Sequence, residues 1–205
     1  MSDINVLFTI PLIKIEVKDD TSELLSCKQY YTSTVQNKNP EEHDILCAEN
    51  RVLERYPKSK KIFTDIFDSV AKDQLGIDNK FIITTSWMTQ TKPGEKSHIH
   101  NHKNCYFSGV YYYDEYEDDV GPIEFYNPLE DLSSYSLNSS CMNPFTAGSL
   151  QIKPQSKTLL LFPSFLKHSI VTHSGKNVRK SLAFNYAPID DYGVGDSTYM
   201  QSWMP

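Results

Sequence analysis

The chain has 205 residues, 39% of them hydrophobic, which is enough for one domain with a full core, so we expect residues 1–205 to form a single domain. A formal net charge of -6 without a long run of Lys or Arg argues against nucleic acid as the main partner. The N-terminus has an early acid and a proline inside a short apolar run, so we expect neither a signal peptide nor a membrane span there, and the four scattered cysteines suit a reducing compartment. We therefore expect a cytoplasmic protein.

The first part of the chain predicts short elements and one amphipathic helix. Ile10–Ile13 is typical of an edge strand broken by its proline, and Ser22–Tyr31 could form a capped helix. From Lys58 to Leu75, apolar residues recur at intervals of three and four, which predicts a helix with one apolar face. Gly76 follows and is expected to end this helix.

From about residue 80 to residue 187, β-branched and aromatic residues alternate with Gly, Pro, Asn and Asp. This core predicts seven strands: Phe81–Gln90, Ser108–Tyr113, Ile123–Tyr126, Ser149–Lys153, Thr158–Phe162, His168–Thr172 and Arg179–Ala187. The helices precede the strands instead of alternating with them, so a parallel sheet is not expected. The pattern predicts a mainly β fold, either a sandwich or a barrel.

Four of the six histidines fall in two places within this core. His98, His100 and His102 alternate in one segment, and His168 starts a later strand. Alternate side chains of an extended segment point the same way, so these imidazoles can converge on a metal ion. The cysteines lack CxxC spacing and cannot be the main ligands. The two other histidines are predicted to lie at the surface: His43 and His173.

The last predicted strand has one polar and one packing face. The polar face consists of Arg179, Ser181, Ala183 and Asn185, and the other face of Leu182, Phe184 and Tyr186. A guanidinium group binds a carboxylate with two hydrogen bonds, and a neighbouring hydroxyl can add a third. A metal together with this carboxylate anchor indicates a chelating organic acid as ligand.

The order of four motifs carries a resemblance: H-x-H, then S-G-V-Y-Y, then F-P-S-F-L-x-H-S-I, then R-x-S-x-x-F-N. This order resembles the Fe(II)- and 2-oxoglutarate-dependent oxygenase superfamily, and in particular oxygenases of marine bacteria and their phages. The resemblance covers Trp87 to Asn185. It implies a double-stranded β-helix, or jelly-roll, with flanking N-terminal helices, and the host cytoplasm as the location if a phage encodes the chain.

The resemblance also implies a reaction and a site. The cofactors would be Fe(II) and 2-oxoglutarate, and dioxygen would be consumed to hydroxylate a substrate with release of succinate and carbon dioxide. The implied metal ligands are His100, His102 and His168. Arg179 and Ser181 match the R-x-S that grips the far carboxylate of 2-oxoglutarate. The pocket around the co-substrate is expected to include Tyr111, Tyr113, Phe125 and Asn185.

One feature departs from the superfamily, in which most members have H-x-D before the distal histidine. Here no acid stands at that spacing. His102 could replace the carboxylate. Alternatively, His98 and His100 could bind the metal, with His102 next to them but not bound to it. Alternatively an acid such as Asp114 or Glu124 could reach the metal. All three arrangements are open at this point.

Two other functions fit parts of the same pattern. A cupin-like metal protein that does not use 2-oxoglutarate is compatible with Pro93-Gly94 before the H-x-H and with Pro163 before His168, but it has no need for Arg179 and Ser181. A structural zinc site in a β-sandwich interaction module is the non-enzymatic alternative, and it would be closed and tetrahedral. The sequence leaves the primary substrate open, as well as the formation of a homodimer.

Overall fold

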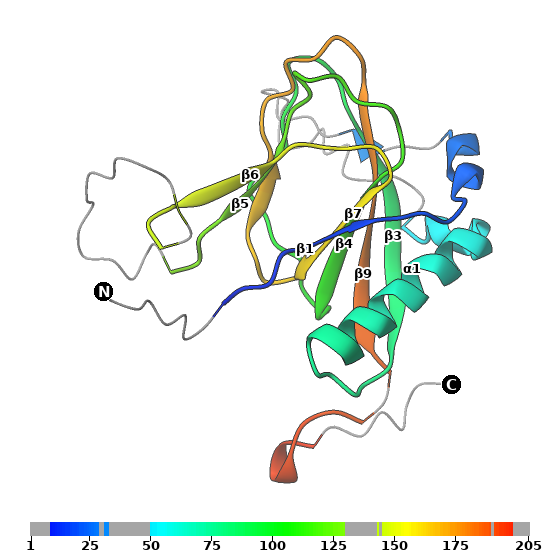
Figure 1. Cartoon of the computed structure of the whole chain (residues 1–205), viewed down its shortest axis with the longest axis vertical. Helices are drawn as coiled ribbons and strands as arrows, with labels where there is room; N and C mark the ends of the chain where they lie inside the picture. The colour runs from blue at the N-terminus through cyan, green and yellow to red at the C-terminus, as the bar shows by residue number, and fades with distance from the viewer. Residues whose placement is uncertain are drawn as a thin grey trace, which may run out of the picture.

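The computed structural model describes residues 9–28, 31–32, 50–129, 143, 145–189 and 191–198. The predictions for His43 and for residues 29–30 therefore lie outside the described residues. The described chain forms two β-sheets, and helix α1 (Pro57–Ser69) lies across the larger one (Figure 1).

The larger sheet has the strand order β1-β7-β4-β9-β3-β2. Its strands are β1 (Ile13–Glu16), β7 (Thr158–Pro163), β4 (Phe107–Tyr112), β9 (Arg179–Pro188), β3 (Phe81–Thr91) and β2 (Tyr31–Thr32). Neighbours are antiparallel except β2 and β3. The predicted strand at Ile10–Ile13 is an edge strand, as expected, but it begins only at Ile13, because Pro11 has no amide hydrogen to give to the ladder.

The smaller sheet has the order β6-β5-β8 and closes the fold over the larger one. Its strands are β6 (Ser149–Ile152), β5 (Ile123–Tyr126) and β8 (His168–Ile170). An apolar core lies between the two sheets: Val110, Tyr112, Ile123, Phe125, Leu160, Phe162, Leu166 and Ala183. The predicted mainly β class is confirmed, and the seven predicted core strands begin and end within two residues of the observed ones.

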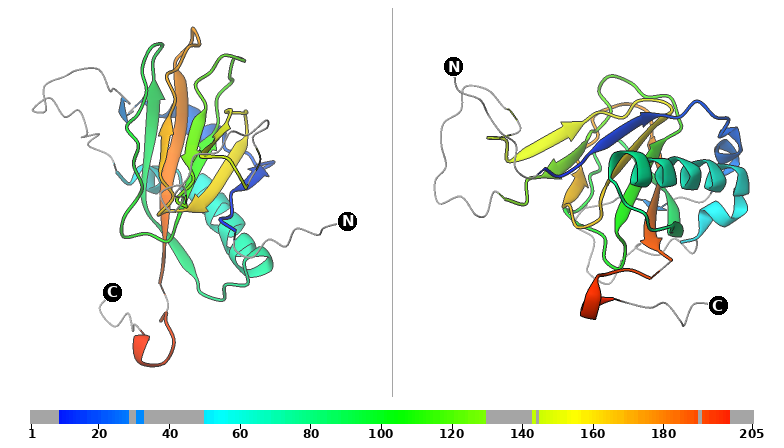
Figure 2. Two further views of the ribbon diagram at one scale, coloured as in Figure 1. Left: turned by 90° about the vertical axis from the view of Figure 1, so that its left-hand side faces the viewer. Right: turned by 60° about the horizontal axis from the view of Figure 1, so that its bottom comes forward.

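Helix α1 covers the outer face of the larger sheet, as both turned views show (Figure 2). Its Phe67 stacks on Tyr186 of β9 at a centroid distance of 4.1 Å, and its Phe63 stacks on Phe184 at 5.0 Å. The helix continues into the π-helical segment η3 (Val70–Gln74), and the chain then turns at Gly76, whose φ is +65°. This left-handed conformation is the reason that glycine ends the predicted helix.

The predicted helix at Ser22–Tyr31 is wrong in its extent. Only the 3-10 helix η1 (Ser22–Ser26) forms, and Cys27 is already extended. Two further 3-10 segments are η2 (Val52–Arg55), before α1, and η5 (Gly195–Ser197), which extends away from the sheets near the C-terminus (Figure 2). Leu24 of η1 is fully buried, so tertiary packing and not helix propensity holds this segment.

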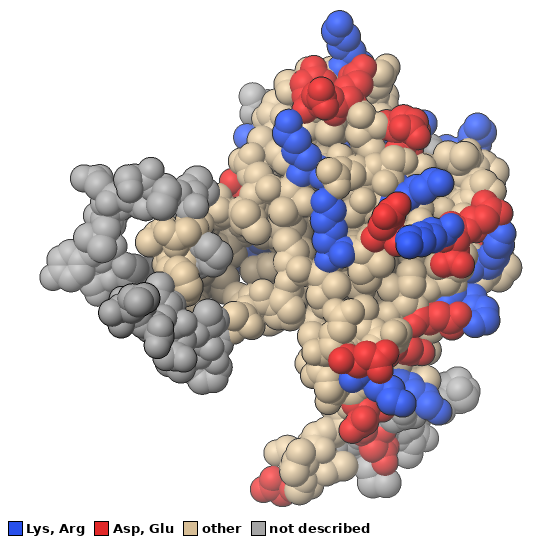
Figure 3. Space-filling view, viewed as in Figure 1, with Lys and Arg blue, Asp and Glu red and all other residues tan. Residues whose placement is uncertain are grey.

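The surface around α1 carries charges of both signs. Figure 3 shows acidic and basic side chains interleaved on this face. The compact basic group at the start of α1 is paired: Lys58 with Asp20 at 2.6 Å, Lys60 with Glu54 at 2.8 Å, and Lys61 with Asp65 at 2.5 Å. Within the described ranges, no helix combines the length and the apolar character needed to cross a membrane.

We expect Gly109→Ala to destabilise the fold, because β4 passes close to an aromatic ring. A Cβ at Gly109 would stand 2.5 Å from Cε2 of Phe184. Overpacking of this kind costs about 1–3 kcal/mol, which chemical denaturation would measure. In a Phe184→Leu background the same alanine should cost clearly less. Additive effects of the two substitutions would show that the ring is not the obstacle.

Candidate metal centre

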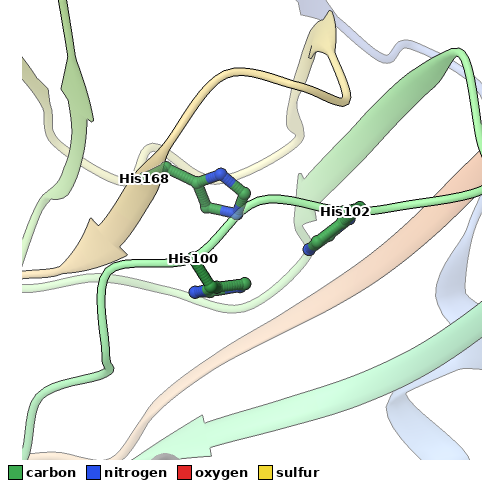
Figure 4. A group of neighbouring side chains, drawn as sticks. All are labelled: His100, His102 and His168. Atoms are coloured by element: carbon green, nitrogen blue, oxygen red, sulfur yellow. The ribbon is translucent and has the colours of Figure 1, made fainter. Parts of the chain in front are cut away.

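Three histidine side chains converge at one end of the fold. His100 lies before β4 and pairs with His168 at the start of β8, with backbone N–H···O distances of 3.0 and 2.8 Å in the two directions. The backbone N–H of His102 donates to the carbonyl of Ser164 at 2.9 Å. The potential ligand atoms of the three imidazoles lie within 4.8 Å of one another, and the rings point toward one another (Figure 4).

The hydrogen bonds of the rings leave the same nitrogen atom free in each case. Each Nδ1 lies beside an oxygen atom: that of His100 is 2.8 Å from the carbonyl of His98, that of His168 is 2.9 Å from the carbonyl of Leu166, and that of His102 is 2.6 Å from Oδ1 of Asn185. A protonated Nδ1 that donates to an oxygen leaves the Nε2 lone pair available to a metal. His98 thus contributes its carbonyl, and its exposed imidazole does not join the cluster.

The surroundings of His102 and His168 favour the neutral form of these two imidazoles. His168 is 5% exposed, and its ring lies against Phe162 at a centroid distance of 4.9 Å and against Phe125 at 6.0 Å. Burial, and next the nearby His100, lower the pKa of His168 to about 3. Burial also lowers the pKa of His102. Neutral imidazole is the form that binds a metal, so these two side chains are ready to bind one at neutral pH.

Neither of the acids considered from the sequence joins the cluster. Asp114 pairs with Lys180 at 3.5 Å. Glu124 accepts hydrogen bonds from Ser149 at 2.8 Å and Tyr126 at 2.9 Å, because it points to the opposite face of β5 from Phe125. Among the described residues, the group that could hold a metal therefore consists of three histidines, with His102 at the position that a carboxylate occupies in the H-x-D pattern.

The ring of His102 is held by a polar network. Its Nδ1 also lies 3.0 Å from Oγ of Ser108, which donates to Oδ1 of Asn185 at 2.8 Å. The amide of Asn185 in turn donates to Oγ1 of Thr85 at 2.9 Å. Asn185, which the sequence analysis predicted at the co-substrate, contacts His102, one of the three candidate metal ligands.

Removal of this support should weaken the metal site. We expect Asn185→Ala to lower metal affinity by about 10- to 100-fold, because the partners that orient a ligand are typically worth this much. Asn185→Asp keeps an acceptor at the same place and should retain the affinity. Titration with Ni(II) against a competing chelator would measure both. Equal affinities in the wild-type protein and the alanine variant would contradict the role of Asn185.

Arg179 is buried on the same face of β9 as Asn185. It is 1% exposed, and it donates from Nε to the carbonyl of Gly121 at 3.1 Å and from Nη2 to the hydroxyl of Tyr112 at 3.1 Å. Nη1 lies 3.4 Å from Oγ of Ser181. None of the ion pairs between described residues involves Arg179. A buried cation without an acidic partner calls for an anionic ligand.

A second polar group beside Arg179 lacks a partner. Thr91 of β3 stands directly opposite Arg179 in the β3–β9 register, so the two side chains share a face. The Oγ1 atom of Thr91 is buried and has no hydrogen-bond partner. Such orphan groups cost free energy, so a ligand oxygen is the expected partner. No pattern in the sequence indicates a role for Thr91, because only the strand register places it beside Arg179.

The structure corrects the predicted pocket tyrosines. Tyr111 points to the helix-covered face of the larger sheet, where its hydroxyl bonds Thr21 at 2.8 Å and its ring packs on Phe63. Tyr113 packs against the same helix-side core. Tyr112, which lies between them, faces the inner side and contacts Arg179, because side chains alternate along a strand.

The prediction of a surface position for His173 is also wrong. Its side chain is 1% exposed, because the loop between β8 and β9 folds back under the segment at Gly94 and Glu95. The isolated position of this histidine in the sequence gave no indication of burial. His173 is separate from the three clustered histidines.

The donor set fits iron. Imidazole nitrogen binds Fe, Ni, Cu and Zn, and three neutral donors leave the full double charge of Fe(II) uncompensated. A dianionic chelator such as 2-oxoglutarate would neutralise that charge. The fold and the site together define the class of the 2-oxoglutarate- and iron-dependent oxygenases, with His100, His102 and His168 able to hold the metal and Arg179 and Thr91 able to meet a distant carboxylate.

Comparison with protein families agrees. Residues 85–185 match the model of the family described as "Putative 2OG-Fe(II) oxygenase", and this range includes the three histidines and Arg179. This segment of 101 residues, just under half of the chain, is similar to the 2OG-Fe(II) oxygenase family. A search among curated proteins finds no match.

Solved structures show the same fold. HygX from Streptomyces hygroscopicus, with nickel and 2-oxoglutarate bound, matches with a TM-score of 0.51 and 13% identity over 88% of this chain and 83% of that chain. A prolyl hydroxylase from Trichoplax adhaerens, in complex with a hypoxia inducible factor peptide fragment, matches with a TM-score of 0.51 and 14% identity over 85% of this chain and 82% of that chain. A 2OG-Fe(II) oxygenase family oxidoreductase from Burkholderia pseudomallei matches with a TM-score of 0.45 and 16% identity over 62% of this chain and 51% of that chain. This match thus spans about half the length of the Burkholderia protein. The first two confirm the double-stranded β-helix.

Proposed function

We propose that this chain is an Fe(II)- and 2-oxoglutarate-dependent dioxygenase that hydroxylates a substrate still to be identified. The observation that carries the proposal is the buried guanidinium of Arg179, which has no acidic partner among the described residues. Arg179 lies on the same inner face of β9 as Asn185, the residue that contacts His102. A metal site alone would not need this cation. A metal and a distant carboxylate anchor together fit a 2-oxo diacid.

Each part of the site has its own role in this proposal. Bound Fe(II) would supply the oxidative decarboxylation of 2-oxoglutarate to succinate and carbon dioxide, coupled to insertion of one oxygen atom into a substrate C–H bond. Arg179, with Ser181 and the orphan hydroxyl of Thr91, would hold the far carboxylate and so orient the co-substrate. Phe125 and Phe162 exclude water from one side of His168.

The described cysteines suit a cytoplasmic location. Neither Cys27 nor Cys105 forms a disulfide within the described residues. Free thiols persist in a reducing compartment. We propose the cytoplasm as the place of the activity on this ground.

Anaerobic titration tests the proposal against its two alternatives. The metal-free protein is given Fe(II) and then 2-oxoglutarate, and the visible charge-transfer band of the chelate is recorded. We expect a saturable band, and after addition of oxygen we expect succinate to form. A cupin-like protein would bind the metal without the band. A structural zinc site would take Zn(II) tightly and resist exchange with Fe(II), and either result would overturn the proposal.

A further inference from the structure

The buried imidazole of His173 has both of its nitrogen atoms occupied. Nδ1 accepts from the backbone N–H of Gly121 at 3.1 Å and lies 3.4 Å from the N–H of Gly175. Nε2 lies 2.6 Å from the backbone carbonyl of Asn177. Because Nδ1 accepts, Nε2 carries the proton and donates it to this carbonyl. The ring is thus fixed as one tautomer, without a lone pair for a metal.

The contact with Gly121 links this ring to Arg179. The N–H of Gly121 points to His173, and the carbonyl of the same residue accepts the Nε–H of Arg179 at 3.1 Å. Gly121 lies in the connection between β4 and β5, whereas His173 and Arg179 flank the turn between β8 and β9. The two connections lie together at one end of the sheets (Figure 1). A single residue of the first connection is therefore held between the imidazole and the guanidinium.

The two connections approach so closely that a Cβ at either glycine would make a very short contact. A Cβ at Gly121 would lie 2.7 Å from the carbonyl oxygen of Val171 and 2.9 Å from Cα of His173. A Cβ at Gly175 would lie 2.6 Å from Cε1 of the same ring. Glu117 adds a further link, since its carboxylate accepts from the side chain of Asn177 at 2.6 Å. The ring of His173 therefore has little freedom to move, and neither has Gly121.

The position of the Gly121 carbonyl decides how the guanidinium is turned. With Nε held by this carbonyl, the two Nη atoms face the hydroxyls of Tyr112 and Ser181, on the inner side of β9. A guanidinium fork binds a carboxylate well only in the correct orientation. If Gly121 shifted, the fork would turn with it.

We propose that His173 is a positioning residue for the co-substrate: by holding Gly121 it sets the orientation in which Arg179 meets the far carboxylate of 2-oxoglutarate. The inference rests on the function proposed above. It concerns a residue outside the metal centre, and it predicts an effect on the affinity for 2-oxoglutarate and not on the affinity for the metal.

Two substitutions at the same position separate this role from a merely structural one. In His173→Asn, the amide oxygen can stand near the place of Nδ1 and still accept from Gly121, whereas the bond to Asn177 is lost. In His173→Gln, the amide nitrogen can reach the place of Nε2 and donate to Asn177, whereas the acceptor for Gly121 is lost. Each variant loses one hydrogen bond, so thermal denaturation should show similar destabilisation.

The measurement is the dissociation constant of 2-oxoglutarate from the Fe(II)-loaded protein, taken from the charge-transfer band, together with the Ni(II) affinity of each variant. We expect His173→Gln to raise the 2-oxoglutarate constant by about fivefold to tenfold, the worth of one hydrogen bond, and His173→Asn to stay within about twofold of the wild type. Ni(II) affinity should not change. Equal constants in the two variants, or a change in Ni(II) affinity of the same size, would overturn the inference.

A second variant covers the case in which His173→Gln does not fold. Gly175→Ala keeps the histidine, but the added Cβ would displace Cε1 of its ring. This variant should raise the dissociation constant of 2-oxoglutarate without altering the Ni(II) affinity. An unchanged constant in this variant would count against the role of His173. If the wild-type protein itself shows no band with 2-oxoglutarate, the proposed function fails, and the positioning role fails with it.

Discussion

His168→Ala is expected to abolish the iron chelate. His168 is the most buried of the three clustered histidines, and its Nε2 is free because Nδ1 is bound to the carbonyl of Leu166. Outer partners of metal ligands are worth about 10- to 100-fold in affinity, so loss of a ligand should cost more than about 100-fold. Competitive titration with Ni(II) would measure the loss, and the charge-transfer band with Fe(II) and 2-oxoglutarate should disappear.

His98→Ala is the matched control for this prediction. His98 is an exposed histidine two residues from His100, and it contributes only its backbone carbonyl, which alanine retains. This variant should bind Ni(II) as the wild type does. Loss of binding in the His98 variant, or retention in the His168 variant, would mean that the metal is held by a different set of histidines.

Arg179→Gln is expected to weaken the binding of 2-oxoglutarate by about 100-fold or more at unchanged metal affinity. The physical reason is the loss of two charge-assisted hydrogen bonds to a carboxylate, each worth about 1.5–3 kcal/mol. Arg179 is 1% exposed, so solvent cannot replace these bonds. The measurement is again the dependence of the charge-transfer band on 2-oxoglutarate concentration.

Lys180→Gln removes the same formal charge one residue away. Lys180 belongs to the other face of β9 and pairs with Asp114 at 3.5 Å. We expect the affinity of the Lys180→Gln protein for 2-oxoglutarate to stay close to that of the wild type, because solvent-accessible charge pairs contribute little. If both variants weakened the binding of 2-oxoglutarate equally, the effect would reflect overall charge. That result would contradict a contact between Arg179 and the carboxylate.

The sequence predicted the strands well because the signal for a strand is local. Alternation along Arg179–Asn185 assigned the two faces of β9 correctly, and the structure has Arg179, Ser181 and Asn185 together on the inner face. The failed prediction at Ser22–Tyr31 has the opposite cause. That segment has no strong period, and contacts with the rest of the chain limit its helix to Ser22–Ser26.

The pocket tyrosines show the limit of a local pattern. In β4 every residue is buried, so the strand has no alternation of buried and exposed residues that could tell one face from the other. Tyr111 and Tyr112 differ only in the side of the sheet to which they point. The presence of α1 on one side and of the smaller sheet on the other decides which tyrosine meets Arg179.

By itself, the sequence determined the mainly β class, the positions of the core strands and the residue types of the site, because strand periodicity and the spacing of His100, His102 and His168 can be followed along the chain. The tertiary structure alone decided that His102 and not an acid completes the cluster, that Thr91 stands beside Arg179, and that His173 is buried against Gly121. These relations depend on sheet register and on the meeting of distant loops. No local period encodes them, since the contacting residues are far apart in the chain.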